Sequence, residues 1–287
     1  MIFRSFKWLA LVCLLPGALQ AQQVPYEAEP EKQVHWAMAA FFGTGWYQVD
    51  ENRSMYIFRI PPRQTVRRAG WDEDGNRKVG IEIQYPVALG LHRLDDIPDF
   101  IDFENYGTIT FTPGVQVEVP INRRWSLRPY AHFGIGYEND TGEYARIWYG
   151  GVKSRYMLDD RNRWALLSGI YVAGYKPEFE SRGRYGSVMA GFEFDHKLAD
   201  LRLGDDPLYL NWHLTYNYLF DDLQFHIDEE RVATIDDTWE LGIALGKGQR
   251  KIKIWLFSFE HIGLAFKSST NGDYKAITVN FRSPFTY

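Results

Sequence analysis

The feature that most constrains this chain is an alternation of apolar and polar side chains with a period of two, sustained over long segments. It is clearest over 208–220, where alternate positions hold Leu208, Leu210, Trp212, Leu214, Tyr216, Tyr218 and Phe220. The positions between them include Asn211, His213, Thr215 and Asn217. Because successive side chains of a β-strand point to opposite faces, the pattern predicts strands with one apolar face and one polar face.

Twelve segments of this kind follow one another along the chain. They cover 35–49, 54–61, 78–91, 106–119, 125–137, 144–158, 163–175, 184–196, 208–220, 238–246, 251–267 and 273–287. Ordinary strands are about five or six residues long, so a series of longer ones favours a sheet that crosses a bilayer. The predicted fold class is all-β, a transmembrane antiparallel up-and-down β-barrel of about 12 strands. A soluble two-sheet sandwich is the alternative, because it would show the same alternation.

The pattern is irregular in a few places. The first segment could begin as a helix over 31–42, before the glycine and aromatic run at 42–47. Alternation breaks down over 147–155 and 254–261, which predicts bulges or a shifted register. Pro113 interrupts another segment, and it predicts a local bulge because proline cannot donate a hydrogen bond to the ladder.

The last segment, 273–287, carries its apolar residues on one face and ends on an aromatic side chain. That face includes Ile277, Val279, Phe281, Phe285 and Tyr287. A soluble protein rarely leaves such a strand at an edge, whereas a closed barrel gives every strand a partner on each side. We expect this strand to close the barrel and to engage the outer-membrane barrel assembly machinery.

The start of the chain predicts export. Arg4 and Lys7 precede an apolar run at 8–15 and a small-residue end at 18–21, which is the pattern of a secretory signal peptide over 1–21. An uncleaved anchor is the competing interpretation, but the run is shorter than the roughly 20 residues that span a bilayer. Cys13, the chain's one cysteine, lies in this segment, so we expect no disulfide in the mature protein. We assign 22–34 to a short periplasmic lead and 35–287 to the barrel.

Composition excludes other classes. No apolar run after the signal segment approaches 18 residues, so helical membrane spans are not expected. The chain has 32 Lys and Arg against 37 Asp and Glu and shows no basic stripe, which argues against nucleic acid as a partner. Aromatic residues make up 16% of the chain, including ten tryptophans, and the aromatic girdles of a membrane barrel would use them.

The connecting segments predict the orientation. Barrels of the outer membrane have short periplasmic turns and longer outer loops. With the first strand leaving toward the outside, 120–124, 159–163 and 247–250 become short periplasmic turns. The outer loops are then 92–105, 176–183 and 221–237. The segment 62–77 is an exception, because it is a long connection predicted on the periplasmic side.

Several stretches resemble the solitary outer-membrane autotransporter-like β-domain family. They are 42–47 with 58–62, then 86–92, 127–132, 238–246 and 281–285. The resemblance covers the chain from about Phe42 to the C-terminus and implies a 12-stranded barrel similar to an autotransporter translocator, produced alone. About 12 residues separate the expected signal peptide from the first expected strand, so we expect no passenger domain.

Two classes of outer-membrane enzyme use barrels of similar size, and the first is the omptin-like proteases. Asp72 with Asp74, and Asp195 beside His196, have spacings found in such sites. However, the first pair lies in a stretch with turn chemistry, and adjacent strand residues point to opposite faces. Ordinary turn carboxylates and a histidine at a strand end explain these residues better.

The second class is the outer-membrane phospholipases, which need a histidine and a serine two residues apart on the lipid-facing side. His213 and Thr215 have this spacing but share the polar face. The histidines show no metal-ligand spacing. We therefore expect no enzymatic activity, no metal and no cofactor.

The polar faces supply the most informative candidates. The residues expected to face the lumen as a polar network are Lys78, Glu82, Gln84, Glu118, Arg128, His132, Glu193, His213, Asn217 and Glu240. Both charge signs occur, so one hypothesis is a network of ion pairs that fills the lumen of a structural or surface-interaction barrel. The alternative is a narrow channel for small solutes, although no ring of one sign indicates selectivity. A surface hydrolase is the third and least favoured hypothesis.

The expected surroundings follow from this class. A barrel of this kind would lie in the cell outer membrane, in contact with lipid and lipopolysaccharide. The acidic outer segments 95–104 and 221–237 are candidate contact surfaces, through divalent cations that bridge lipopolysaccharide.

Overall fold

The computed structural model describes residues 35–49, 53–91, 107–159, 163–179, 182–226, 232–247, 252–254, 257–259 and 261–281. The expected signal peptide at 1–21, the lead at 22–34 and the acidic segment 95–104 lie outside these residues. No helix in the part of the chain that the structure describes is long and apolar enough to cross a membrane.

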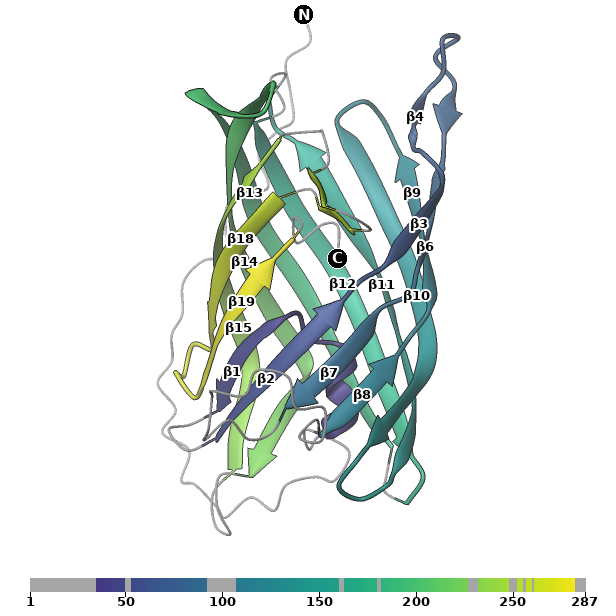
Figure 1. Ribbon diagram of the computed structural model, residues 1–287, viewed down its shortest axis with the longest axis vertical. Helices are drawn as coiled ribbons and strands as arrows, with labels where there is room; N and C mark the ends of the chain where they lie inside the picture. Colours follow the sequence, from purple (N-terminus) through teal and green to yellow (C-terminus); the bar gives the residue numbers. More distant parts are fainter. Residues whose placement is uncertain are drawn as a thin grey trace, which may run out of the picture.

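The protein is a closed antiparallel β-barrel of 12 wall strands (Figure 1), which confirms the predicted fold class. Eight of the twelve are single continuous elements: β10 (Trp125–Glu138), β11 (Tyr144–Met157), β12 (Trp164–Pro177), β13 (Gly183–Leu203), β14 (Asp206–His226), β15 (Val232–Gly246), β18 (His261–Ser268) and β19 (Tyr274–Asn280). A ninth, β1 (Gly45–Val49), pairs antiparallel with β19, with Gly45 opposite Thr278. This pairing of the first and last strands leaves the sheet without a free edge.

Each of the other three wall strands consists of two elements separated by a proline. They are β2 (Arg53–Ile60) with β3 (Arg63–Arg67), β6 (Gly80–Gln84) with β7 (Val87–Leu91), and β8 (Thr108–Phe111) with β9 (Gly114–Pro120). The carbonyl of Pro62 accepts from the N–H of Tyr85, and that of Pro86 accepts from the N–H of Thr112. The three interruptions therefore lie side by side. The bulge predicted at Pro113 is wrong, because the pairing with β10 keeps one register across the proline: Phe111 lies opposite Ile135 and Gly114 lies opposite His132.

The segment 62–77, expected as a long connection, is half strand. It contains β3 and a short hairpin of β4 (Gly70–Trp71) and β5 (Arg77–Lys78), which projects at the upper right of Figure 1. Gly75 has φ +80° in the turn between them, a conformation that favours glycine. The link between the two paired segments is therefore only the tight turn at 72–76, which agrees with the rule that periplasmic turns are short.

Two further expectations on the later strands are wrong in detail. The segment 251–267 is not one strand, because β16 (Ile252–Ile254) and β17 (Phe257–Phe259) form a separate pair and only β18 belongs to the wall. The expected outer loop 221–237 is largely strand, since β14 continues to His226 and β15 begins at Val232. The register shift between Tyr218 and Leu223 marks a bulge, which obscured the continuation of the alternation.

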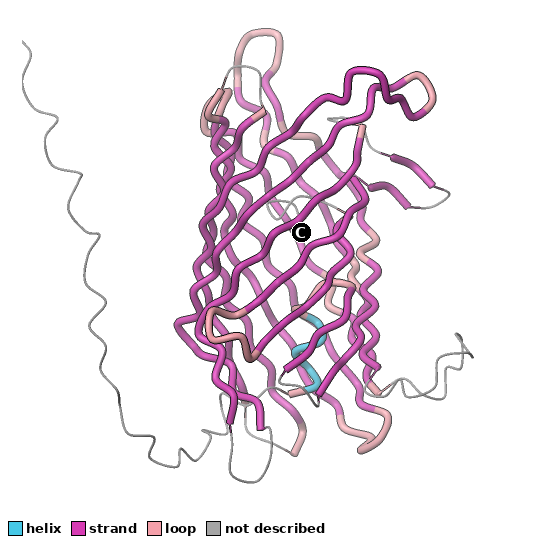
Figure 2. The backbone as a smooth tube through the Cα atoms, turned by 90° about the vertical axis from the view of Figure 1, so that its left-hand side faces the viewer, coloured by secondary structure: helices cyan, strands magenta, loops and turns pink. Residues whose placement is uncertain are grey.

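The first expected strand, 35–49, is correct only in its second half. Residues Trp36–Ala40 form a short 3₁₀ helix, η2, which lies inside the barrel toward its lower end (Figure 2). His35 begins the helix, and its Nδ1 accepts a hydrogen bond from the N–H of Ala37 at 3.1 Å. The run from Ala37 to Ala40 is apolar on every side, which suits an element enclosed on all sides better than a wall strand.

The outer surface is apolar and carries aromatic side chains near both ends. Phe133 and Leu264 are more than half exposed, although both are large and apolar. Near the upper end of Figure 1, Trp125 lies opposite Tyr156 in the pairing of β10 with β11, and the ring of Trp164 contacts those of Phe194 and Trp212. Those near the lower end join Tyr137 with Tyr144 and Tyr216 with Trp239. The surface thus has an apolar belt between two aromatic bands.

Candidate functional site: the barrel lumen

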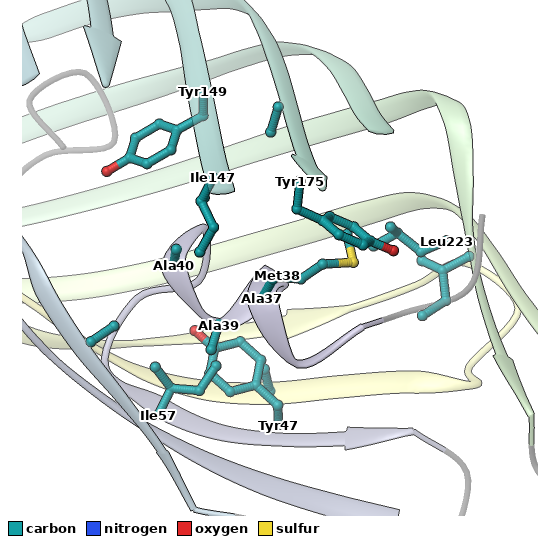
Figure 3. Packing of buried hydrophobic residues seen from close by; sticks show 14 of the residues in the cluster. Ala37, Met38, Ala39, Ala40, Tyr47, Ile57, Ile147, Tyr149, Tyr175 and Leu223 are labelled. Carbon is teal, nitrogen blue, oxygen red and sulfur yellow. The ribbon is translucent and has the colours of Figure 1, made fainter. Parts of the chain in front are cut away.

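Helix η2 fills the lower part of the lumen (Figure 3). Its residues Ala37 to Ala40 are 0–2% exposed and pack with buried side chains from several wall strands, among them Ile57, Ile147 and Tyr175. The helix contacts β7, β8, β10, β11 and β12, so it bridges much of the wall. This packing buries apolar area at the place where an open pore would hold water.

Polar contacts hold the start of the helix to the lower rim. Trp36 Nε1 donates to Glu143 Oε2 at 3.2 Å, and His35 Nε2 lies 3.6 Å from the same oxygen. The His35 ring stacks on Tyr175 with centroids 4.7 Å apart. Glu143 also accepts from the N–H of Phe179 at 3.2 Å. The carboxylate of Glu143 therefore joins the helix to two wall segments.

Above the helix, a buried carboxylate joins three wall strands. Glu240 on β15 is 3% exposed and lies 2.7 Å from Lys267 Nζ on β18 and 2.9 Å from His213 Nε2 on β14. Glu240 and Lys267 are direct cross-strand partners, while His213 lies opposite Gly242. A side chain at Gly242 would collide with the His213 ring, so this glycine makes room for it. We call Glu240, His213 and Lys267 the acid-centred cluster.

A second charged group lies nearer the upper end. Glu193 Oε1 accepts from Arg155 Nη2 at 3.2 Å and from Asn211 Nδ2 at 3.1 Å. Asn211 also donates to Asp195 Oδ1 at 2.8 Å, and Arg155 lies 3.9 Å from Asp195 Oδ2. The Arg155 guanidinium and the Asn211 amide thus each contact both carboxylates, those of Glu193 and Asp195.

Two simpler ion pairs lie on the wall strands beside the prolines. Arg128 Nη2 donates to Glu118 Oε2 at 3.0 Å, and Arg63 Nη1 lies 3.3 Å from Glu82 Oε2. Gln84 Nε2 donates to Glu82 Oε1 at 2.8 Å. These groups are ordinary cross-strand pairs on the polar face of a sheet.

Tyrosines gather on the opposite side of the lumen from β18. The ring of Tyr171 lies 6.5 Å from that of Tyr130 and 6.3 Å from that of Tyr149, centroid to centroid. The ring of His132 stacks on Tyr149 at 4.4 Å, and its Nδ1 lies 2.8 Å from the carbonyl oxygen of Thr112. Arg59 Nη2, on β2, donates to the Tyr149 hydroxyl at 2.8 Å. We call Tyr130, Tyr149, Tyr171 and Arg59 the tyrosine cluster.

Most of the expected lumen residues lie on the inner face, but they do not form one network. Glu82 with Gln84, Glu118 with Arg128, Glu193, and His213 with Glu240 fall into four separate groups. His132 belongs with the tyrosines, and Asn217 lines a cavity near the acid-centred cluster. Lys78 is a correction, because it is exposed on β5 in the projecting hairpin. Lys78 has the same place in the alternation as Glu82 and Gln84 of β6, but β5 lies in the hairpin and outside the barrel wall.

The sequence analysis missed several lumen residues that complete these groups. Arg155 and Tyr149 fall in the stretch 147–155, where the alternation breaks down, and Lys267 closes an expected strand whose register was uncertain. Arg59 lies on the polar side of its strand in the sequence, and this position could have predicted that it faces the lumen. Trp36 carried no signal, because nothing local indicates that a helix lies inside the barrel.

The candidate enzyme residues do not assemble into a catalytic site. Asp72 bonds the backbone and side chain of Asn76 in the exposed hairpin turn. Asp195 points to Asn211, while His196 is exposed on the outer face. His213 Nδ1 has no hydrogen-bond partner, so no hydroxyl is held in position for His213 to activate. Among the described residues, no three His, Cys, Asp or Glu side chains come together as a metal site.

A cavity of about 190 Å³ lies between helix η2 and the two clusters. Its lining includes the tyrosine cluster, Glu240, Met38 of the helix and Phe41, which follows the helix. No protein-family model and no curated protein matches this chain. The function is therefore inferred from the geometry of the lumen.

Proposed function

We propose that this protein is a non-enzymatic outer-membrane β-barrel with a closed lumen, similar to an autotransporter translocator. Its role would be structural or in surface interaction. One observation supports this most directly: helix η2 fills the lower lumen with four residues that are almost completely buried. Ion pairs above the helix cross-link neighbouring strands, so the interior resembles a packed core more than a water-filled pore.

The outer surface supports membrane insertion. An apolar belt lies between two aromatic bands, as expected where a barrel meets hydrocarbon in the middle and headgroups at both ends. In this proposal the upper end of Figure 1 is periplasmic, because the tight turns at 72–76 and 121–124 lie there. Lipid and lipopolysaccharide would surround the barrel, and the barrel assembly machinery would engage its last strand.

Planar-bilayer conductance of the refolded protein tests the closed lumen. We expect no stable current steps above leak for the unaltered chain. Met38→Asp places a charge in the packing of η2, where Met38 is 2% exposed, and it should release the helix and produce steps. Val66→Asp is the matched control, because Val66 is 57% exposed on β3, and it should stay silent.

A narrow channel for small solutes is the second candidate, favoured by the cavity above the helix. It predicts stable steps in the unaltered protein, and that result would remove the closed-lumen proposal. Release of the helix would then change the size of the current and would not create it.

A further inference from the structure

The cavity above η2 combines aromatic walls with an excess of positive charge. Arg59, Lys153 and Lys267 line it, whereas the one carboxylate among its lining residues is Glu240. Glu240 already bonds Lys267 and His213. Lys153 Nζ lies 5.2 Å from the centre of the Tyr130 ring. The side of the cavity next to the tyrosine cluster is therefore cationic.

Arg59 differs from the other arginines of the lumen. Arg63, Arg128 and Arg155 each have a carboxylate oxygen within 3.0–3.3 Å. The described hydrogen bond and ring contact of the Arg59 side chain are instead with Tyr149, through the hydroxyl at 2.8 Å and the ring at 5.8 Å. A guanidinium presents several donors in one plane and binds a carboxylate through two of them, so most of its binding capacity remains here.

A second polar group of the cavity lining has no hydrogen-bond partner among the residues that the structure describes. The hydroxyl oxygen of Tyr171 is buried from solvent and has no hydrogen-bond partner. Its ring packs against Phe41 of the helix segment, Tyr130, Tyr149 and Tyr185. A buried hydroxyl without a partner is costly. Its oxygen has almost no surface open to a water-sized atom, so an acceptor in the cavity would satisfy it after a small shift of the Tyr171 side chain.

We propose that this cavity binds a small aromatic carboxylate. The carboxylate would bond the Arg59 guanidinium and accept from the Tyr171 hydroxyl, with Lys153 adding positive charge nearby. The ring would lie among the tyrosine and Phe41 faces, which favour a flat apolar body. A volume of about 190 Å³ is below the range of about 300–1,000 Å³ that holds drug-sized ligands, so a single-ring molecule fits best.

A second, smaller cavity adjoins the first. It has a volume of about 60 Å³ and shares Gly43, Arg59 and Gln84 with the larger one. It extends to Asn280 and Phe281 at the seam where β19 meets β1. Arg59 thus lies at the boundary between the two cavities, where an anion would meet it without displacing the helix.

Titration calorimetry with benzoate, on the full mature chain refolded in detergent, tests the site. We expect saturable binding, and weaker or no binding of the uncharged benzamide. Arg59→Gln should weaken benzoate binding about tenfold or more, because it removes a charge-assisted hydrogen bond. Tyr171→Phe, which removes one hydroxyl and keeps the ring, should weaken it about three- to tenfold.

Arg128→Gln is the matched control, because Arg128 is a lumen arginine that already bonds Glu118; it should leave benzoate affinity unchanged. A shift in gel mobility on heating shows that each variant is folded. The proposal fails if folded wild-type protein does not bind benzoate at about 1 mM. It also fails if Arg59→Gln binds as well as wild type, or if inorganic phosphate binds as tightly as benzoate. If the refolded barrel shows no conductance steps and does not bind benzoate, the closed-lumen proposal stands and the benzoate site is ruled out.

Discussion

The acid-centred cluster and the tyrosine cluster face the same lumen but are built in different ways. Glu240 and Lys267 are direct partners on adjacent strands, and His213 comes from the next strand along. Arg59 reaches Tyr149 from a strand 90 residues away in sequence, across the lumen. Local strand pairing therefore gives a cluster with balanced charges. Closure of the barrel brings together groups that local pairing did not match, and there Arg59 has no carboxylate partner among the described contacts.

The largest expected effect tests the balance of the acid-centred cluster. Glu240→Ala should lower the free energy of unfolding by about 3–5 kcal/mol, because Lys267 loses its buried counter-charge. Urea unfolding of the refolded barrel measures this. Glu118→Ala is the control, because its pair with Arg128 is more exposed, and it should cost about 1 kcal/mol or less. Equal losses would show that burial does not distinguish the two pairs.

The next prediction concerns the helix side of the lumen. A Cβ atom at Gly136 would lie 2.7 Å from Cζ3 of Trp36, so Gly136→Leu should overpack the base of η2. We expect a loss of about 1–3 kcal/mol in unfolding free energy. Ala131→Leu, on the outer face of the same strand, should be close to neutral. If both variants behave alike, η2 does not stabilise the barrel.

A smaller effect is expected within the tyrosine cluster. Tyr149→Phe removes the hydroxyl that accepts from Arg59 and lies 3.1 Å from Thr112 Oγ1. The loss should be about 1 kcal/mol, since the cavity beside Arg59 can hold water as a replacement partner. Tyr144→Phe, on an exposed ring, is the control and should show no change in urea unfolding. A loss as large as that of Glu240→Ala would erase the contrast between the clusters.

The smallest expected effect lies outside both clusters, in the turn after β11. The backbone N–H groups of Trp164 and then Arg163 donate to the Asp159 carboxylate and lower its pKa from 3.8. A lowered pKa in the folded state means that the carboxylate stabilises the fold above about pH 3.9, and that this contribution disappears as pH falls through the lowered value. Asp159→Asn should reduce this acid dependence slightly, as urea unfolding across pH would show. A pH profile identical to wild type would contradict the assignment.

Much of the wall was predictable because alternation is a local property. Thr108, Thr110 and Thr112 face inward and Ile109 and Phe111 outward, as their spacing indicates. Prediction failed where the strand left the wall or bulged, since one extra residue inverts every later assignment. Lys78 continues the alternation of Glu82 and Gln84, but it lies on β5, where the chain has left the wall for the projecting hairpin. Tyr149 and Arg155 lie on a strand with no register shift, but the residue types of that stretch show no clear period.

The site was less predictable than the wall, for a physical reason. The sequence alone determined that long two-faced strands would form and that polar side chains would share one surface, because strand geometry fixes which neighbours share a face. Which of those side chains meet across the lumen depends on how the sheet closes and on the 3₁₀ helix enclosed within it. Closure joined Arg59 to Tyr149 and left the Tyr171 hydroxyl without a partner beside a cavity, and only the tertiary structure decided this.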